Sequence, residues 1–312
     1  MSQSTSTILM IRPNGFRANE QTATSNYFQK ISNDRSSSEL TLSAQKEFDV
    51  FVELLRNHGV NVIVHQDTGE QDTPDSVFPN NWLSFHEDGS VALYPMMAEN
   101  RRLERQESVV EAVEAAGFQI TNFIDYTEAE ADGIFLEGTG SIVLDRENRK
   151  AYCALSPRAN EDLFIEFCED FEYTPFVFEA FQTVEDSRKP IYHTNVVMCI
   201  ADHYAVVCLD AVDDKKERRS LEKSLKFDGK KIIAITEEQM HSFAGNMLQV
   251  QSQTGKTHLV MSQQAHDALR PEQLNTLKGL DTLIVASIPT IETCGGGSAR
   301  CMMAEVFLPR SK

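Results

Sequence analysis

Cys301 stands in surroundings that suit a nucleophile. Three glycines at 295–297 precede it and let the backbone turn tightly, Arg300 is its neighbour, and an apolar run that ends at Pro309 follows it. A thiol at the mouth of a strand, after a flexible loop and beside an arginine, is placed where a reactive cysteine would be. A free cysteine taken alone is more often a small buried hydrophobe, so the positions of other polar residues must decide.

Four more polar residues precede apolar runs at nearly equal intervals along the chain. They are Asn81, Glu137, His193 and Asn246, and neighbours in the series that ends at Cys301 are 53 to 56 residues apart. A period of this length predicts repeated supersecondary units, and units arranged around an axis bring equivalent positions together. We therefore expect the five side chains to converge on one pocket. A pocket with a cysteine, a histidine and a glutamate is typical of nucleophilic catalysis.

The hydrophobic pattern predicts the same elements in each unit: two strands, a helix and a third strand. The expected units are 8–77, 78–134, 135–189, 190–242 and 243–312. The clearest expected helices are 44–57, 100–116, 161–171 and 213–225. The last two expected strands are 283–288 and 302–308, and the final one returns to pair with the first, 8–13. Closing the ring in this way removes exposed sheet edges.

The sequence thus predicts an α/β fold with pseudo-fivefold symmetry, formed by residues 1–312 as a single domain. A polar loop rich in Asn, Thr and Ser follows the first strand as far as residue 25. A loop of this composition could cover the pocket as a lid.

Composition excludes several classes of function. The net charge of −18 argues against nucleic acid and anionic lipid as partners, because both require clustered Lys and Arg. No apolar run reaches 18 residues, and the polar N-terminus lacks a signal peptide, so we expect a cytoplasmic protein without a membrane segment. The six cysteines form no C-x-x-C pair and no zinc pattern, so we expect reduced thiols and no metal.

Several motifs, taken in order, resemble those of the pentein, or guanidine-modifying, superfamily. This superfamily includes arginine deiminases, dimethylarginine hydrolases, agmatine deiminases and amidinotransferases. The resemblance covers essentially the whole chain. The motifs are Phe78-Pro-Asn-Asn81, Phe135-Leu-Glu137-Gly, Ser156-Pro-Arg158-Ala-Asn160, His193-Thr-Asn195 and Gly-Gly-Ser-Ala-Arg-Cys301-Met. The fold that the resemblance implies is the pentein α/β propeller.

The resemblance implies catalysis by substitution at a planar carbon that bears nitrogen atoms. Cys301 would attack this carbon as a thiolate and form a covalent intermediate, which water then releases. His193 would protonate the leaving nitrogen and later deprotonate the water, and Glu137 would orient His193. No cofactor is implied. Cys294 is a rival nucleophile, but it precedes the glycines and breaks the spacing.

Other matched positions imply contacts with an amino-acid substrate. Arg158 and Arg101 resemble the family's ligands for the α-carboxylate, although Arg102 could serve as well as its neighbour. Phe78 and three asparagines complete the implied substrate-binding set. These asparagines are Asn81, Asn195 and Asn246.

Two departures from the family pattern favour a neutral substrate. Arginine deiminases carry carboxylates for the guanidinium group at two positions that here are Asn81 and Asn195. A buried cation without a carboxylate loses several kcal/mol, on the order of a thousandfold in binding. Amides both donate and accept hydrogen bonds, as a ureido group requires. Since other members of the superfamily also use asparagine here, the two residues favour citrulline without excluding a guanidino substrate.

Three functions stay open at this point. The leading one is a cysteine hydrolase of citrulline-like ureido or guanidino amino acids, including the arginine and methylarginine deiminase type. The second is an amidinotransferase, which shares the covalent step. The third is a non-catalytic pentein that acts as a binding protein, against which the Cys, His and Glu residues count. The sequence is compatible with a monomer or a homo-oligomer.

Overall fold

The computed structural model describes residues 2–30 and 34–311, and in them one three-stranded sheet topology occurs five times. In each sheet the first two strands are antiparallel and the third is parallel to the second. The first sheet is β17 (Ala304–Glu305), β1 (Thr7–Arg12) and β2 (Asn61–Gln66). The second is β3 (Leu83–Phe85), β4 (Ser90–Leu93) and β5 (Asn122–Asp125), and the third is β6 (Ile142–Asp145), β7 (Lys150–Leu155) and β8 (Thr174–Glu179). The fourth is β11 (Met198–Ile200), β12 (Tyr204–Val207) and β13 (Lys231–Ala234), and the fifth is β14 (Leu248–Gln251), β15 (Thr257–Ser262) and β16 (Thr282–Ala286).

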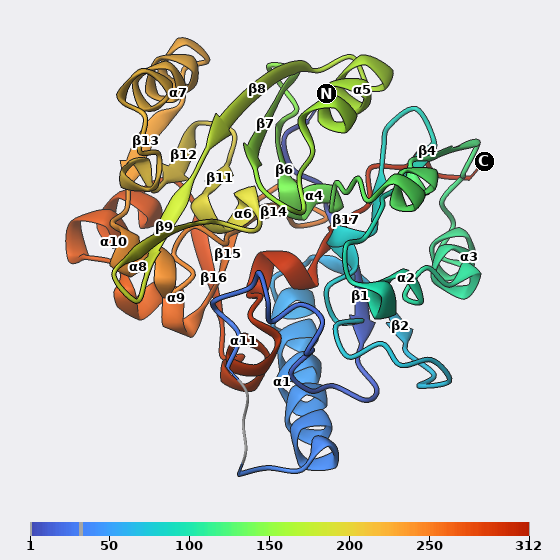
Figure 1. The fold of residues 1–312 in the computed structure, drawn as a ribbon. Helices are drawn as coiled ribbons and strands as arrows, with labels where there is room; N and C mark the ends of the chain where they lie inside the picture. The colour runs from blue at the N-terminus through green and yellow to red at the C-terminus, as the bar shows by residue number, and fades with distance from the viewer. Residues whose placement is uncertain (1, 31–33, 312) are drawn as a thin grey trace.

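Each parallel pair requires a crossover, and helices supply it. The connecting helices lie at the periphery of the molecule and the strands lie inside them (Figure 1). They are α1 (Ser37–Asn57), α2 (Glu99–Arg102) with α3 (Glu107–Ala115), α5 (Glu161–Asp170), α7 (Lys215–Phe227), and α9 (Gln263–Ala268) with α10 (Pro271–Lys278). The remaining helices are α4 (Gly138–Ser141), α6 (Thr194–Val197), α8 (Glu237–His241) and α11 (Pro289–Gly295). The 3₁₀ turns are η1 (Pro79–Asn81), η2 (Thr127–Asp132), η3 (Leu209–Ala211) and η4 (Ala299–Met302). The mixed α/β class predicted from the sequence is therefore confirmed.

Local signals explain where the helices begin. Helix α1 starts seven residues before the predicted 44, because Ser36 and Glu39 form a capping box. Its buried face, with residues spaced three and four apart, packs against β1 and β2 of the first sheet, β16 of the fifth, and α11. These residues are Leu40, Ala44, Phe48, Phe51 and Leu55. Asn160 and Asp214 cap α5 and α7 in the same way, with side-chain oxygens that accept backbone N–H groups.

Three further expected elements are corrected by the structure. The helix expected at 100–116 is broken into α2 and α3, and the strand expected at 283–288 ends at Ala286, before α11. The strand expected at 302–308 is only β17, because η4 takes up the residues before it. β17 nevertheless pairs with β1, with Ile8 opposite Glu305, as predicted. A hairpin that was not predicted, β9 (Phe181–Val184) and β10 (Ser187–Pro190), precedes α6.

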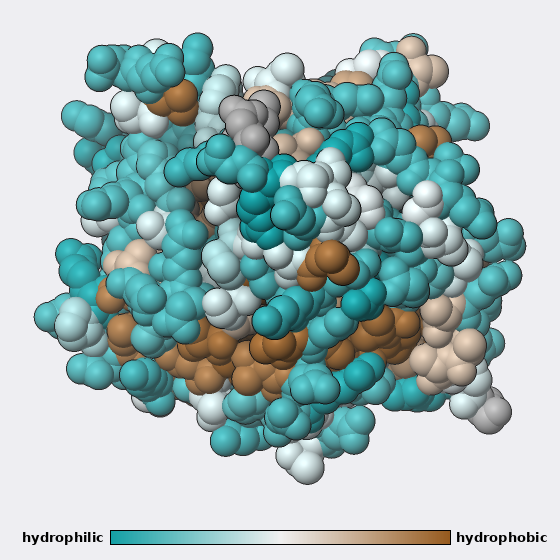
Figure 2. Space-filling view, turned by 90° about the horizontal axis from the view of Figure 1, so that it is seen from below, coloured by the Kyte–Doolittle hydropathy of each residue, from teal (hydrophilic) through white to brown (hydrophobic). Residues whose placement is uncertain are grey.

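The surface agrees with the acidic composition. Hydrophilic side chains predominate on the face seen from below, and hydrophobic ones gather in a band across it (Figure 2). Within residues 2–30 and 34–311, no helix has both the length and the apolar content needed to cross a membrane.

Candidate active site

The five periodic residues all lie just before the first strand of a sheet, and four of them lie at short helical turns. Glu137 and His193 are the N-cap residues of α4 and α6, and Asn81 and Cys301 lie within η1 and η4. Asn246 follows a backbone turn closed by its N–H to the Phe243 carbonyl. The turn at α4 contacts those at η1 and α6, and η1 contacts η4. The convergence predicted from the spacing is therefore seen, although the residues lie in the turns before the strands and do not open the strands themselves.

Gly140 permits this close approach. A Cβ atom at this position would lie 2.4 Å from Asn81 Nδ2 and 2.7 Å from His193 Nδ1. Separations of this size are steric clashes, so any larger residue would push the two side chains apart. The Gly-Thr-Gly sequence after Glu137 thus serves the packing of the turns against one another.

His193 and Glu137 form a buried hydrogen-bonded pair. His193 Nε2 lies 2.7 Å from Glu137 Oε2, and both residues are at most 2% exposed. The Met97 N–H donates to Glu137 Oε1 at 3.1 Å, and Arg158 Nη1 lies 3.4 Å from Oε2. Glu137 therefore fixes the orientation of the imidazole, as a third member of a catalytic triad does.

The electrostatics of this pair favour a carboxylate beside a neutral imidazole. Burial raises the pKa of Glu137, but the Arg158 charge and the His193 hydrogen bond outweigh it and lower the pKa to about 2. Burial lowers the pKa of His193 to about 4, against the opposing effect of Glu137. At neutral pH the resting imidazole is then free to accept a proton.

Two amides surround the sulfur of Cys301. Asn246 Nδ2 lies 3.3 Å from Sγ and Asn195 Nδ2 lies 3.5 Å from it. The Arg300 N–H donates to Asn246 Oδ1 at 3.1 Å, which turns the Asn246 amide nitrogen toward the sulfur. Amide N–H donors stabilise a thiolate more than a thiol.

The thiol and the imidazole face the same small cavity, of about 10 Å³. A space of this size holds about one water molecule, so the site is closed in this structure. Predicted residues that line the cavity are Phe78, Asn81, Arg101, Arg158, His193 and Cys301. Further lining residues are Thr22, Asn26, Asp75, Tyr192 and 295–297. Asn195 and Asn246, predicted to contact substrate, lie instead against the sulfur and outside this lining.

Arg101 and Arg158, the predicted ligands for a substrate carboxylate, differ in their hydrogen-bond partners. Arg101 donates to both oxygens of Glu104 at 2.9 Å and to Asn81 Oδ1 at 2.7 Å, so most of its donors are used by the protein. Arg158 donates instead to Ser25 Oγ, at 2.7 and 3.0 Å, and to the Thr22 carbonyl at 3.0 Å. Movement of residues 22–25 would free the Arg158 guanidinium for a carboxylate.

Those residues belong to the polar loop predicted as a lid. Besides the contacts with Arg158, Asn26 Nδ2 donates to the Gly296 carbonyl at 3.1 Å. The Tyr192 hydroxyl donates to the same carbonyl at 2.6 Å. The loop is therefore hydrogen-bonded to both sides of the cavity and covers it.

Asp75 is a site residue that the sequence reasoning missed. It is 2% exposed and lines the cavity, and its Oδ2 accepts from Asn19 Nδ2 at 2.8 Å, while Oδ1 has no partner among the described residues. Burial raises the pKa of this carboxyl, against the lowering effect of Arg101. The available signal was its position three residues before Phe78 and six before Asn81, in one loop.

Among residues 2–30 and 34–311, no group of three or more His, Cys, Asp or Glu side chains is arranged to hold a metal ion. The six cysteines are free and buried. The pKa of the rival thiol Cys294 is raised by burial, and Cys294 is absent from the cavity lining. The geometry therefore favours Cys301 as the nucleophile.

Comparisons with known proteins cover almost the whole chain. The model of the family described as "N,N dimethylarginine dimethylhydrolase, eukaryotic" matches residues 12–308. No curated protein matches the sequence significantly.

Many solved structures are similar in fold, and three of them show the range of similarity. Apo ArgZ, an arginine dihydrolase from the ornithine-ammonia cycle in Cyanobacteria, has a TM-score of 0.74 at 18% identity over 97% of this chain and 41% of its own. The chain thus spans about two fifths of ArgZ. The N-terminal domain of an ArgZ variant, covalently bound to a reaction intermediate, gives 0.71 at 18% identity over 97% of this chain and 99% of its own. The adduct of a dimethylarginine dimethylaminohydrolase variant with S-methyl-L-thiocitrulline gives 0.63 at 16% identity over 96% and 98%.

Proposed function

The chain belongs to the N,N dimethylarginine dimethylhydrolase family of the pentein superfamily, whose hydrolases cleave guanidino C–N bonds, and we propose that it hydrolyses the ureido group of citrulline. In this proposal Cys301 is the nucleophile, His193 the general acid and base, and Glu137 the group that orients His193. We also propose that the chain is one catalytic domain with pseudo-fivefold symmetry, which the five three-stranded sheets of the described residues support.

The charges of the residues that line the cavity favour a substrate with a neutral head group. Asp75 is the only acidic residue among the described residues that line the cavity. An amino-acid substrate brings an α-ammonium group, which suits the unpartnered Oδ1 of Asp75, and an α-carboxylate, which suits Arg158. No lining carboxylate is then left for a guanidinium. A ureido group requires none, because it carries no charge.

The reaction follows from the positions of three side chains. Transfer of the thiol proton to neutral His193 gives a thiolate, which adds to the ureido carbon. The tetrahedral adduct collapses as His193 donates its proton to the leaving δ-nitrogen, which releases ornithine and leaves Cys301 carbamoylated. His193 then deprotonates a water that attacks the carbamoyl carbon. The products are carbamic acid, which decomposes to ammonia and carbon dioxide, and the restored thiol.

Asn195 and Asn246 take a different role from the predicted one. Their amide nitrogens donate to the sulfur, so we propose that they stabilise the thiolate instead of binding the substrate head. Asn81 keeps its predicted place at the cavity, with Oδ1 held by Arg101.

Related structures support a covalent route. The N-terminal domain of an ArgZ variant is covalently bound to a reaction intermediate, and a dimethylarginine dimethylaminohydrolase variant forms an adduct with S-methyl-L-thiocitrulline. The contact between His193 and Glu137 beside a cysteine argues for catalysis over a purely binding role. An amidinotransferase, a homo-oligomer and a cytoplasmic location stay predictions, as does the lack of a cofactor.

The substrate panel is the deciding experiment. Purified protein is incubated with citrulline, arginine, agmatine and methylarginines, and ornithine, ammonia and citrulline are measured. We expect ornithine and ammonia from citrulline in equal amounts, with kcat/KM for citrulline on the order of a thousandfold above that for arginine, since the lining offers no second carboxylate.

Two outcomes would contradict the proposal. Formation of ornithine from arginine with comparable kcat/KM would identify an arginine dihydrolase of the ArgZ kind. Transfer of the one-carbon group to an added amine in preference to water would identify a transferase.

The Asp75→Asn variant tests the proposed ammonium contact. We expect KM for citrulline to rise by roughly a hundredfold, because a buried carboxylate that pairs with an ammonium is lost, while kcat changes less. The matched control is Glu70→Gln, an exposed carboxylate near the same loop, which should leave KM unchanged. With 5-ureidopentanoic acid, which lacks the α-amino group, the wild type and Asp75→Asn should differ little. A full loss on this compound too would show that Asp75 acts through the fold.

A further inference from the structure

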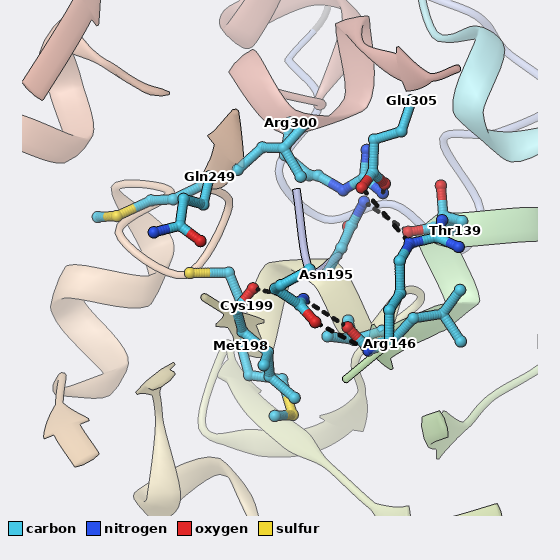
Figure 3. A pocket seen from close by; sticks show the side chains of 14 residues that line it. Thr139, Arg146, Asn195, Met198, Cys199, Gln249, Arg300 and Glu305 are labelled. Atoms are coloured by element: carbon cyan, nitrogen blue, oxygen red, sulfur yellow. Dashed lines mark hydrogen bonds and ion pairs between the residues drawn. The ribbon is translucent and has the colours of Figure 1, made fainter. Parts of the chain in front are cut away.

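A second cavity is lined by Asn195, whose amide nitrogen lies 3.5 Å from the sulfur of Cys301. Its volume is about 30 Å³, room for roughly two water molecules or one anion of four heavy atoms. Its polar lining consists of Gln3, Thr139, Arg146, Asn195, Gln249, Arg300 and Glu305, most of which are labelled in Figure 3. Cys301, His193 and Asp75 do not line it.

Arg146 is the charged residue of this cavity that suggests a ligand. Its side chain is 3% exposed, and its guanidinium carbon lies 3.9 Å from the centre of the Phe307 ring. Within residues 2–30 and 34–311, its one polar side-chain partner is Glu305, whose Oε1 is 3.9 Å from Nε. The Phe307 ring covers one face of the guanidinium, and no hydrogen bond from its Nη groups to another described residue is seen.

The other charges of the cavity do not compensate Arg146. Glu305 is already engaged by Arg300, whose Nη2 donates to Oε2 at 2.9 Å. The second Nη of Arg300 donates to the Met303 carbonyl at 2.8 Å. Two guanidinium groups and one carboxylate leave a net positive charge among the largely buried residues that line the cavity. Burial of an uncompensated charge is unfavourable, so an anion at this place would stabilise the protein.

We propose that this cavity binds a small planar oxyanion of the bicarbonate and carbamate type, held by the Nη groups of Arg146. Such an anion presents two coplanar oxygens, which match the paired donors of one guanidinium edge. The volume in this structure admits an anion of this class.

Asn195 connects this cavity with the chemistry. Its side chain lines the cavity, and its Nδ2 lies 3.5 Å from Cys301 Sγ and 3.4 Å from the Thr139 carbonyl. The Asn195 amide therefore lies between the sulfur and the proposed anion site. For carbamate, the inference rests on the proposed function: hydrolysis of the carbamoylated cysteine gives carbamic acid, which loses a proton to become an anion of this class.

The test measures binding without turnover. Bicarbonate labelled with ¹³C is titrated by NMR into the wild type, Arg146→Met, Arg146→Lys and Arg219→Met, with sodium chloride at equal ionic strength as reference. We expect Arg146→Met to weaken binding by roughly tenfold or more, because a charge-assisted pair is lost. Arg146→Lys, which keeps the charge, should fall in between, and it also serves if the methionine variant does not fold. Arg219 is exposed, so Arg219→Met should bind as the wild type does.

A second arm identifies the source of the anion. In a single turnover with citrulline labelled at the ureido carbon, release of the label should lag behind ornithine in the wild type, and the lag should shorten in Arg146→Met. A lag that is the same in both proteins limits the ligand to bicarbonate from solution and overturns the carbamate part.

The proposed anion site would be contradicted if bicarbonate bound equally to the wild type and both Arg146 variants. Full competition by chloride would contradict it as well. If Arg146-dependent binding is found in a protein that does not hydrolyse citrulline, the anion site stands and the proposed function fails.

Discussion

The Cys301→Ala variant is expected to lose turnover by on the order of 10⁴-fold or more, because no other group on the cavity can form the covalent bond to the substrate carbon. The fold should persist, since the substitution removes one buried sulfur and leaves Asn195 and Asn246 to hydrogen-bond with each other and with water. Steady-state kinetics and a thermal unfolding curve measure the two effects. Citrulline binding by calorimetry should stay within a few-fold of the wild type.

Cys294→Ala is the matched control. Cys294 is as buried as Cys301 but lies in α11, outside the cavity lining, and its raised pKa keeps it a thiol near neutrality. We expect nearly full activity. Iodoacetamide should label Cys301 in the wild type, and citrulline should protect it. Labelling of Cys294 together with an active Cys301→Ala variant would show that the nucleophile is the other sulfur.

Changes at His193 and Glu137 should alter the pH dependence of kcat/KM in different ways. The resting imidazole must be neutral to accept the thiol proton, so activity falls as the pH drops through the pKa of His193, which burial lowers to about 4. The negative charge of Glu137 opposes that lowering. In Glu137→Gln the pKa of His193 therefore falls further, the acid limb moves to lower pH, and kcat falls by roughly a hundredfold because the imidazolium is less stabilised.

His193→Ala should lack this acid limb altogether and lose roughly 10²- to 10⁴-fold in kcat. His266 with Asp267, paired at 3.1 Å on the surface, offers a control of the same chemistry, and His266→Ala and Asp267→Asn should change neither limb. An acid limb at the same pH in the wild type and Glu137→Gln would show that a group other than His193 titrates in it.

Much of the fold could be predicted from the repeat period of the sequence. Each unit repeats the same local pattern of apolar runs, so the α/β class, the order of elements and the pairing of the last strand with the first followed from the sequence. Boundaries were less accurate, because caps and turns depend on single residues: Ser36 extends α1, and η4 shortens the final strand to β17.

The sequence by itself also determined which residues meet, since Asn81, Glu137, His193, Asn246 and Cys301 stand at equivalent places in successive units. The direction of each side chain was decided only by the tertiary structure. Spacing along the chain does not predict that the amide of Asn195 points to the sulfur of Cys301, 106 residues away. Nor does it predict that Arg158 donates to Ser25, 133 residues before it.

Asp75 and Arg146 lie outside the periodic series. The role proposed for each depends on polar atoms that are buried in the folded protein with few partners. In the first cavity this is one carboxylate oxygen without a partner, and in the second it is the Arg146 guanidinium, whose ion-pair partner Glu305 is 3.9 Å away. Whether such a group finds a partner depends on which residues distant in sequence pack nearby, because desolvation acts on the assembled surroundings of a group and not on its neighbours in the chain.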